Sequence, residues 1–321
     1  MINLAFLAIS LFLVIKSSNY AVKYASNLAH ALKLPRYVVG FLVVAVISIL
    51  PETFIAINSA LDGIPSFGLG TLFGSNVADL TLVFTIIILS TAGGIRVNSK
   101  ILESNKWYPF FIALPIFAGI DGYYSRPEGI FLIIAGAAFY YLTFRKNHRD
   151  CSAAEEAIEN NHDHNHGKKH IFKNIGYLGL SMAVLLFGAH LTVKYGVSLA
   201  QFVKINPVFI GMLVVGLGTT LPEMIFSIRA VKHKDNCLAL GDILGTVISD
   251  ATIAVGVVAL ISPFSFPVRI IYITAMFMVL ASVLLFHFMR TGRILTKKEA
   301  VLLLFFYAVF ITTEYVVNIL W

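Results

Sequence analysis

The chain has 321 residues, of which 58% are hydrophobic and only 13% carry a charge, and its mean hydropathy is +0.84. These values exclude an ordinary soluble domain and indicate a protein with many membrane-spanning segments. The formal net charge of +7 does not indicate a nucleic-acid partner, because most basic residues fall in loops on one side of the predicted membrane.

Ten apolar runs follow one another along the chain and predict ten transmembrane helices. Most runs are long enough to cross about 30 Å of hydrocarbon as an α-helix. The fourth run is the shortest and contains Pro109 and Pro115, which interrupt helical hydrogen bonding. The runs lie at 2–28, 37–61, 67–90, 107–120, 128–144, 173–200, 207–231, 238–261, 267–289 and 299–320.

The two halves of the chain match without a gap when the sequence is shifted by 171 residues, which places Val22 on Val193. GFLVVAVISILPETFIAI at 40–57 then matches GMLVVGLGTTLPEMIFSI at 211–228. Each half contains five spans, and since five is odd, the second half must enter the membrane from the opposite side. The sequence therefore predicts an all-α membrane protein with ten transmembrane helices in two inverted five-helix repeats, at 1–144 and 173–321.

The basic residues predict the orientation of these spans. If the N-terminus lies outside, 20 of the 24 Lys and Arg residues fall in inner loops. Inner loops of membrane proteins carry such an excess of basic residues. Both termini are therefore expected outside the cell membrane. The four basic residues on the outer side are Arg126, Lys194, Lys204 and Arg269.

A polar segment at 145–172 separates the halves and is predicted to be a cytoplasmic linker. It reads RKNHRDCSAAEEAIENNHDHNHGKKHIF and is rich in histidine. Such a tract is typical of a solvated loop, although its histidines also suit a soft metal ion, and the sequence leaves both interpretations open. The histidines concerned are His162, His164, His166 and His170.

Two Pro-Glu pairs interrupt the apolar runs at matching positions, Pro51–Glu52 and Pro222–Glu223. Because proline has no N–H, each pair leaves a backbone carbonyl one turn earlier without its helical partner. Carboxylate and carbonyl oxygens together are the ligands that Ca²⁺ and Na⁺ prefer. Glu52 and Glu223 are therefore predicted to bind a hard cation.

Each half also places an aspartate inside an apolar run, Asp79 in the first and Asp250 in the second. A Ser or Thr precedes each of the four acids by four residues, which places hydroxyl and carboxylate on one helix face. Small hydroxyl residues can simply connect helices, but membrane-embedded carboxylates that recur in both halves are typical of a functional site. The four hydroxyl residues are Ser48, Ser75, Thr219 and Thr246.

Two sets of motifs carry a family resemblance: GTTLPE at 218–223 with LGDILGTVISD at 240–250, and ILPE at 49–52 with LGTLFGSNVAD at 69–79. They resemble the alpha-repeat motifs of the cation/calcium exchanger superfamily, sodium/calcium exchanger type, and the likeness covers the whole chain. It implies an antiporter without enzyme activity or cofactor that exchanges Ca²⁺ for Na⁺ by alternating access, while the spans at 2–28 and 173–200 slide past a rigid core. The metal ligands it implies are Glu52 and Glu223 for Ca²⁺, Asp79 and Asp250 for the monovalent ion, and the flanking oxygens of Ser48, Ser75, Thr219, Thr220 and Thr246.

The chain departs from the family pattern at several positions. Ile49 and Ile47 replace a usual hydroxyl residue and a glycine, Thr71 and Asp242 stand where asparagine is common, and Asp79 carries a carboxylate where asparagine is frequent. Four carboxylates bring four negative charges, whereas one Ca²⁺ neutralises two. The remainder requires Na⁺, K⁺ or protons, so an H⁺/Ca²⁺ or K⁺-dependent antiporter is the alternative.

Two other protein classes explain fewer of these features. An intramembrane aspartyl protease would use the LGD at 240–242, but Ala239 replaces the first glycine of its signature and the Pro-Glu pairs would have no role. A zinc transporter would explain the histidines of the linker, yet no span contains an HxxxD pattern. The expected partners are the transported ions and the lipid bilayer, with no nucleic acid.

Overall fold

The structure is a computed structural model that describes residues 2–31, 49–91, 93–97, 102, 106–147, 168–232 and 236–320. Most of the described chain is helical. The first part of the predicted second span and the predicted ligand Ser48 lie outside the described residues, as do three of the four linker histidines.

The described part of the first half contains helices and two very short strands. Four of its described helices, α3, α4, α7 and α8, begin at a proline or directly before one, because proline suits the first turn of a helix. The elements in chain order are α1 (Ile2–Ala31), α3 (Leu50–Leu61), α4 (Pro65–Ala78), the π-helical turn η2 (Asp79–Val83), α5 (Phe84–Leu89), β1 (Ile95–Arg96), α7 (Tyr108–Ala118), β2 (Tyr123–Tyr124) and α8 (Arg126–Asn147).

The second half repeats this order. Asn206 begins its second span, because the Asn206 side chain accepts a hydrogen bond from the Val208 N–H and so caps the helix. The elements are α10 (Lys168–Val203), α11 (Pro207–Ile210), η3 (Gly211–Val215), α12 (Gly216–Lys232), α13 (Asn236–Ser249), η4 (Asp250–Ala254), α14 (Val255–Ile261), β3 (Phe264–Ser265), η5 (Ile270–Ala275), α15 (Met276–Arg290), β4 (Ile294–Leu295) and α16 (Lys297–Leu320).

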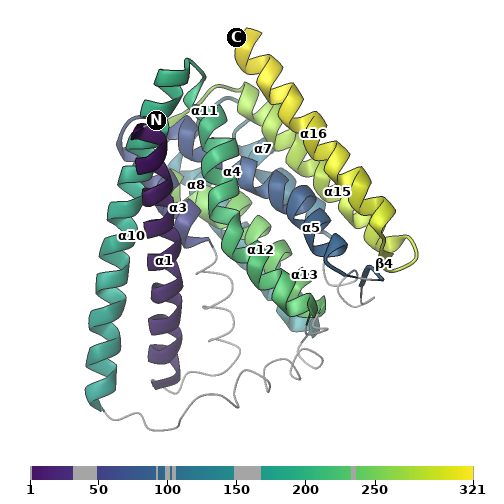
Figure 1. Ribbon diagram of the computed structural model, residues 1–321, viewed down its shortest axis with the longest axis horizontal. Helices are drawn as coiled ribbons and strands as arrows, with labels where there is room; N and C mark the ends of the chain where they lie inside the picture. Colours follow the sequence, from purple (N-terminus) through teal and green to yellow (C-terminus); the bar gives the residue numbers. More distant parts are fainter. Residues whose placement is uncertain are drawn as a thin grey trace.

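The internal repeat is visible in the bounds of these elements. Shifting α4, η2 and β2 by 171 residues gives the bounds of α13, η4 and β4. The first helices of the two halves, α1 and α10, lie side by side and run in opposite directions (Figure 1). The all-α architecture with inverted halves that the sequence predicts is therefore confirmed.

Six helices of the described part are long and apolar enough to cross a membrane. A seventh is added if 207–221 and 223–232 form one span, which is bent by 42°. The bend lies at Pro222, where the missing N–H opens the helix as the sequence predicts. The fourth predicted span is the short helix α7, which contains Pro115. The total of ten spans stays a prediction.

Two helices extend into the range predicted as the linker. Helix α8 continues to Asn147 and α10 begins at Lys168, because hydropathy marks only the apolar part of a helix, whereas its polar ends continue beyond the bilayer. The residues at 148–167 lie outside the described part of the chain, so metal binding by the linker histidines stays untested.

The pair α1 and α10 forms one edge of the molecule, α15 and α16 form the other, and α4, α12 and α13 lie between them (Figure 1). Contacts along the pair join α1 to α10. The rings of Phe6 and Tyr195 stack at 4.8 Å, and the buried Thr192 hydroxyl donates to the Ser10 hydroxyl at 3.1 Å. Leu7, Leu185 and their apolar neighbours form a core cluster of their own.

In the part of the chain that the structure describes, two antiparallel strand pairs connect the halves. Strand β1 pairs with β4, and β2 pairs with β3, so each pair has one strand from each half. Each strand has two residues, which is too short for an alternating pattern. The strands are therefore not predictable from the sequence pattern.

Helix α4 packs very closely against α11 and η3. A Cβ atom built on Gly70 would lie 2.8 Å from Val208 Cγ1, and one on Gly74 would lie 2.8 Å from the Cα of Met212. Glycine is needed at both positions because any side chain would meet atoms of the neighbouring segment.

We expect Gly74→Ala to lower the melting temperature of the purified protein. The added methyl group meets the backbone of Met212, and overpacking of this kind costs about 1–3 kcal/mol. Gly179→Ala is the matched control, because no atom lies within 4 Å of a Cβ at Gly179 in α10. Thermal unfolding in detergent measures both variants, and an unchanged melting temperature for Gly74→Ala would show that α4 can move away from η3 at no cost.

Candidate ion-binding site

Four acidic residues lie in the helices between the two edges of the molecule. Glu52 lies in the first turn of α3, directly after Pro51. Glu223 follows Pro222, at the bend of α12. Asp79 and Asp250 are the first residues of η2 and η4. All four positions are therefore places where regular α-helical hydrogen bonding begins or changes.

The four acids are almost completely buried. The exposed fraction is 1% for Glu52, 1% for Asp79, 6% for Glu223 and 0% for Asp250. Moving an ionised carboxylate out of water costs several kcal/mol unless a counter-charge or hydrogen bonds compensate it. The partners of these carboxylates therefore decide what the site can bind.

Most of the carboxylate oxygens have no hydrogen-bond partner. Both oxygens of Asp79 and of Asp250 are unpartnered, as is one oxygen each of Glu52 and Glu223. Within the described ranges, none of the four acids forms an ion pair with a basic side chain. Buried polar atoms in proteins are nearly always satisfied, so these oxygens fit a site that is completed by cations or protons.

The structure brings the four acids into one electrostatic neighbourhood. Glu223 interacts electrostatically with Glu52, Asp79 and Asp250, which come from three other elements of the fold. Thr219 of α12 also lies close to Glu52 of α3. Residues far apart in the sequence therefore meet between α3, α4, α12 and α13.

The acids do not all converge on one point. In the part of the chain that the structure describes, no three His, Cys, Asp or Glu side chains lie close enough together to hold one ion. A site between Glu52 and Glu223 would have two carboxylates and would be completed by hydroxyl and carbonyl oxygens. Ca²⁺ accepts this mixture.

The predicted hydroxyl ligands are buried beside the acids. Thr219 donates to the carbonyl of Val215 at 3.1 Å, and Thr220 and Ser75 donate to carbonyls of their own helices at 3.0 Å. Because each hydrogen points to a carbonyl, the lone pairs of these oxygens remain free to contact a cation. Thr246 has no hydrogen-bond partner. Ser48 lies outside the described residues.

The π-helical turns η2 and η4 are a feature that the sequence analysis did not predict. Each begins at the aspartate of its repeat, Asp79 or Asp250. Single π-helical turns inside α-helices occur frequently at functional sites, because the widened turn shifts side chains and carbonyls from the regular helical pattern.

Sequence reasoning also missed polar residues that occur in one half only. Asn76 is fully buried, its amide donates to Met278 Sδ at 3.5 Å, and its Oδ1 has no partner. Thr53 beside Glu52 also has an unpartnered hydroxyl. The matching residues of the second half are Val247 and Met224, so a search for recurring polar residues did not select either one.

Two tyrosines of the first half position α13 of the second half. Tyr108 donates to the Leu244 carbonyl at 2.9 Å, and Tyr140 donates to the Gly245 carbonyl at 2.8 Å. The hydroxyl of Tyr140 also contacts that of Ser249, next to Asp250. These bonds fix the helix that leads to Asp250 against α7 and α8.

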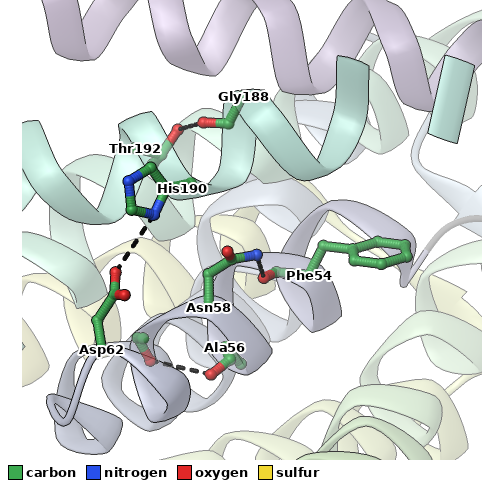
Figure 2. A network of polar contacts seen from close by, with 8 residues as sticks. Phe54, Ala56, Asn58, Asp62, Gly188, His190 and Thr192 are labelled. Atoms are coloured by element: carbon green, nitrogen blue, oxygen red, sulfur yellow. Dashed lines mark hydrogen bonds and ion pairs between the residues drawn. The ribbon is translucent and has the colours of Figure 1, made fainter. Parts of the chain in front are cut away.

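A polar contact joins the edge helix α10 to α3. Figure 2 shows His190 of α10 beside Asp62 at the end of α3, with Nδ1 and Oδ2 3.5 Å apart. Since both side chains are partly exposed, this pair contributes little stability on its own. It does connect the pair of α1 and α10 to the helix that carries Glu52.

Comparison with known families decides the class of the protein. The family described as sodium/calcium exchanger protein matches residues 2–145 and 173–316. The chain belongs to this family. It is therefore a multi-pass membrane protein that exchanges cations, including Ca²⁺, and is not an enzyme.

The chain is similar to proteins from bacteria and archaea. Inner membrane protein YrbG of Escherichia coli is 26% identical over 268 residues, which cover 81% of this chain and 80% of that protein. Sodium/calcium exchanger MaX1 of Methanosarcina acetivorans is 24% identical over 343 residues, covering 97% of each. A solved structure of the sodium-calcium exchanger NCX_Mj, soaked with Na⁺ and Sr²⁺, matches with a TM-score of 0.62 at 22% identity over 97% of each chain. This structural match supports the fold.

Proposed function

We propose that this exchanger moves Ca²⁺ in one direction across the cell membrane and Na⁺ in the other. The observation that supports this proposal is the set of four buried acids whose oxygens have no partner among the described residues. Glu52 and Glu223 bind Ca²⁺, whereas Asp79 and Asp250 bind the monovalent ion. Ser48, Ser75, Thr219, Thr220 and Thr246 supply the neutral oxygen ligands. Beyond the transported ions the exchanger uses no cofactor.

The two ions compete because their sites share the neutral oxygen ligands and because the four carboxylates interact electrostatically. Ca²⁺ neutralises two of the four negative charges, and when it leaves, monovalent cations must replace it for the acids to stay buried. The ion that occupies the site then favours one of two conformations, which open the site to opposite sides of the membrane. The pair of α1 and α10 is suited to move as a unit, since Phe6 stacks on Tyr195 and Ser10 bonds Thr192.

Uptake of ⁴⁵Ca²⁺ into proteoliposomes tests the proposal. Purified protein is reconstituted with an outward gradient of Na⁺, K⁺ or H⁺ in separate preparations, and initial rates are compared. We expect the Na⁺ gradient to drive uptake and the other gradients to have little effect. If only the proton gradient or only the K⁺ gradient drives uptake, that ion and not Na⁺ is the coupling ion. If no gradient drives uptake, the proposal that the protein transports Ca²⁺ is contradicted.

An H⁺/Ca²⁺ or K⁺-dependent antiporter is the second candidate. It is favoured by the asymmetry of the site, because Ile49 is buried at the start of α3 where the second half has Thr220, so the first half lacks a hydroxyl beside its acids Glu52 and Asp79. A proton or a K⁺ ion would then neutralise the charge that Na⁺ neutralises in the first proposal.

The orientation in the membrane is also proposed, with both termini outside the cell. A reporter fused after Trp321 should then be accessible from outside, and one inserted near Asn160 should be accessible only from the cytoplasm. The expectation rests on the basic residues of the inner loops. Accessibility of both reporters from the same side would contradict the orientation and the odd number of spans in the second half.

A further inference from the structure

A line of polar side chains continues from the central acids along one face of α13. Asp242, Thr246 and Asp250 are spaced by four residues and therefore share a helix face. Asp242 lies two turns from Asp250, about 12 Å along the helix axis, toward the connection between α12 and α13. Its exposed fraction is only 6%.

Helix α12, which packs against α13, adds a polar side chain to the same line. Ser227 follows Glu223 by four residues, and its hydroxyl donates to Asp242 Oδ2 at 3.2 Å. This bond is formed between the two helices, so it fixes the Asp242 carboxylate at the contact between α12 and α13. Ser227 is fully buried.

Unpartnered oxygens lie between Asp242 and the central acids. The Thr246 hydroxyl is on the same face of α13, halfway between Asp242 and Asp250, is 3% exposed and has no hydrogen-bond partner. One oxygen of Glu223, a turn from Ser227 on α12, is also unpartnered. Asp242 interacts electrostatically with Glu223 and Asp79, so its charge acts on the same ions as the central acids.

The first half has no counterpart of this arrangement. The residues that match Asp242 and Ser227 are Thr71 and Ala56. Thr71 donates to the Phe67 carbonyl of its own helix at 3.0 Å, and Ala56 has no polar side chain. The pair of Asp242 with Ser227 therefore has no equivalent between α3 and α4.

We infer that Asp242, held by Ser227, forms a second cation position with the Thr246 hydroxyl. It is a staging site where a divalent cation is bound on its way between the α12–α13 end and Glu223. The inference rests on the proposed transport of Ca²⁺. A carboxylate with hydroxyl oxygens replaces part of the hydration shell of a hard cation, and a charged ligand at this depth lowers the cost of moving the ion toward the central acids.

The role predicts an effect that is limited to one side of the membrane. Asp242→Asn removes the charge but keeps the size of the side chain and an oxygen that accepts from Ser227. We expect the half-saturating Ca²⁺ concentration to rise about tenfold, because the staging site only supports the central site, whose own ligands are unchanged in this variant. The rise should occur when Ca²⁺ is supplied from the side of the membrane that the α12–α13 end faces. The half-saturating concentration measured from the other side should stay unchanged.

Initial ⁴⁵Ca²⁺ uptake into right-side-out and everted membrane vesicles measures the two sides separately. In the proposed orientation the α12–α13 end faces the cytoplasm, so the everted vesicles should show the effect. Ser227→Ala, which removes the bond but keeps the charge, should shift the same value by a smaller factor. Asp121→Asn is the control for loss of an acid, because Asp121 is exposed in a turn.

An equal shift on both sides, or no shift on either side, would overturn the staging site. Elution as a single peak and an unchanged melting temperature establish that each variant is folded. Failure of the proposed function gives a different result, because the wild-type protein itself would then show no Ca²⁺ uptake in either kind of vesicle.

Discussion

Replacing Glu52 or Glu223 with glutamine should abolish Ca²⁺ exchange while the protein remains folded in the membrane. Each carboxylate is buried and has an oxygen without a partner, and the two are proposed to share one Ca²⁺. Loss of a direct charged ligand should cost more than the roughly 10–100-fold that loss of a supporting group costs at metal sites. Uptake of ⁴⁵Ca²⁺ by each purified variant should therefore fall to background.

Glutamine keeps the size of the side chain, so the melting temperature should stay close to that of the wild type or rise, since a buried charge has been removed. Glu299→Gln is the control, because Glu299 lies at the polar start of α16 and accepts hydrogen bonds from Thr296. Normal uptake by either Glu52→Gln or Glu223→Gln would contradict a shared Ca²⁺ site.

Asp79→Asn should separate the two candidate coupling ions. Under Na⁺ coupling, the ionised Asp79 compensates for the hydroxyl that Ile49 lacks, so the variant should lose most of its Na⁺ dependence and keep Ca²⁺ binding. Under proton coupling, Asp79 takes up and releases a proton in each cycle. The variant should then lose the pH dependence of transport and show no change in its response to Na⁺.

Calcium flux across a series of pH values, with and without a Na⁺ gradient, measures both properties in the wild type and in the variant. Asp121→Asn serves as the control for an exposed acid. If Asp79→Asn matches the wild type in both series, Asp79 has no part in coupling, and the assignment of the monovalent-ion ligands must change.

Most of what could be predicted from the sequence came from its apolar runs and its internal repeat. Hydropathy and the internal match predicted the helices and the inverted halves, because long apolar runs in a bilayer have few alternatives to helices. Pro222 predicted where α12 loses a regular helical hydrogen bond, which is where the helix bends, since the missing N–H acts locally. The helices and the proline effect depend on neighbouring residues, and the repeat depends on a match within the sequence, so no knowledge of tertiary contacts is needed for any of them.

The features that could not be predicted depend on contacts between distant residues or lack a counterpart in the other half. The hydrogen bonds from Tyr108 and Tyr140 to α13 join residues more than a hundred positions apart. Asn76 was missed because its counterpart is apolar. Symmetry between the halves therefore identified the site residues that both halves have. It assigned no role to Asp242, because the matching residue of the first half is not an acid.

The strand pairs between the halves affect how such a protein can be made. Because β1 pairs with β4 and β2 pairs with β3, neither half completes its own strand pairs, so the half that is synthesised first must wait in the membrane with both strands unpaired. Since β4 is the counterpart of β2, and β3 lies after α14 as β1 lies after α5, the same two pairs would form between two identical single repeats inserted in opposite directions. The strands thus retain the interface of an antiparallel dimer within one continuous chain.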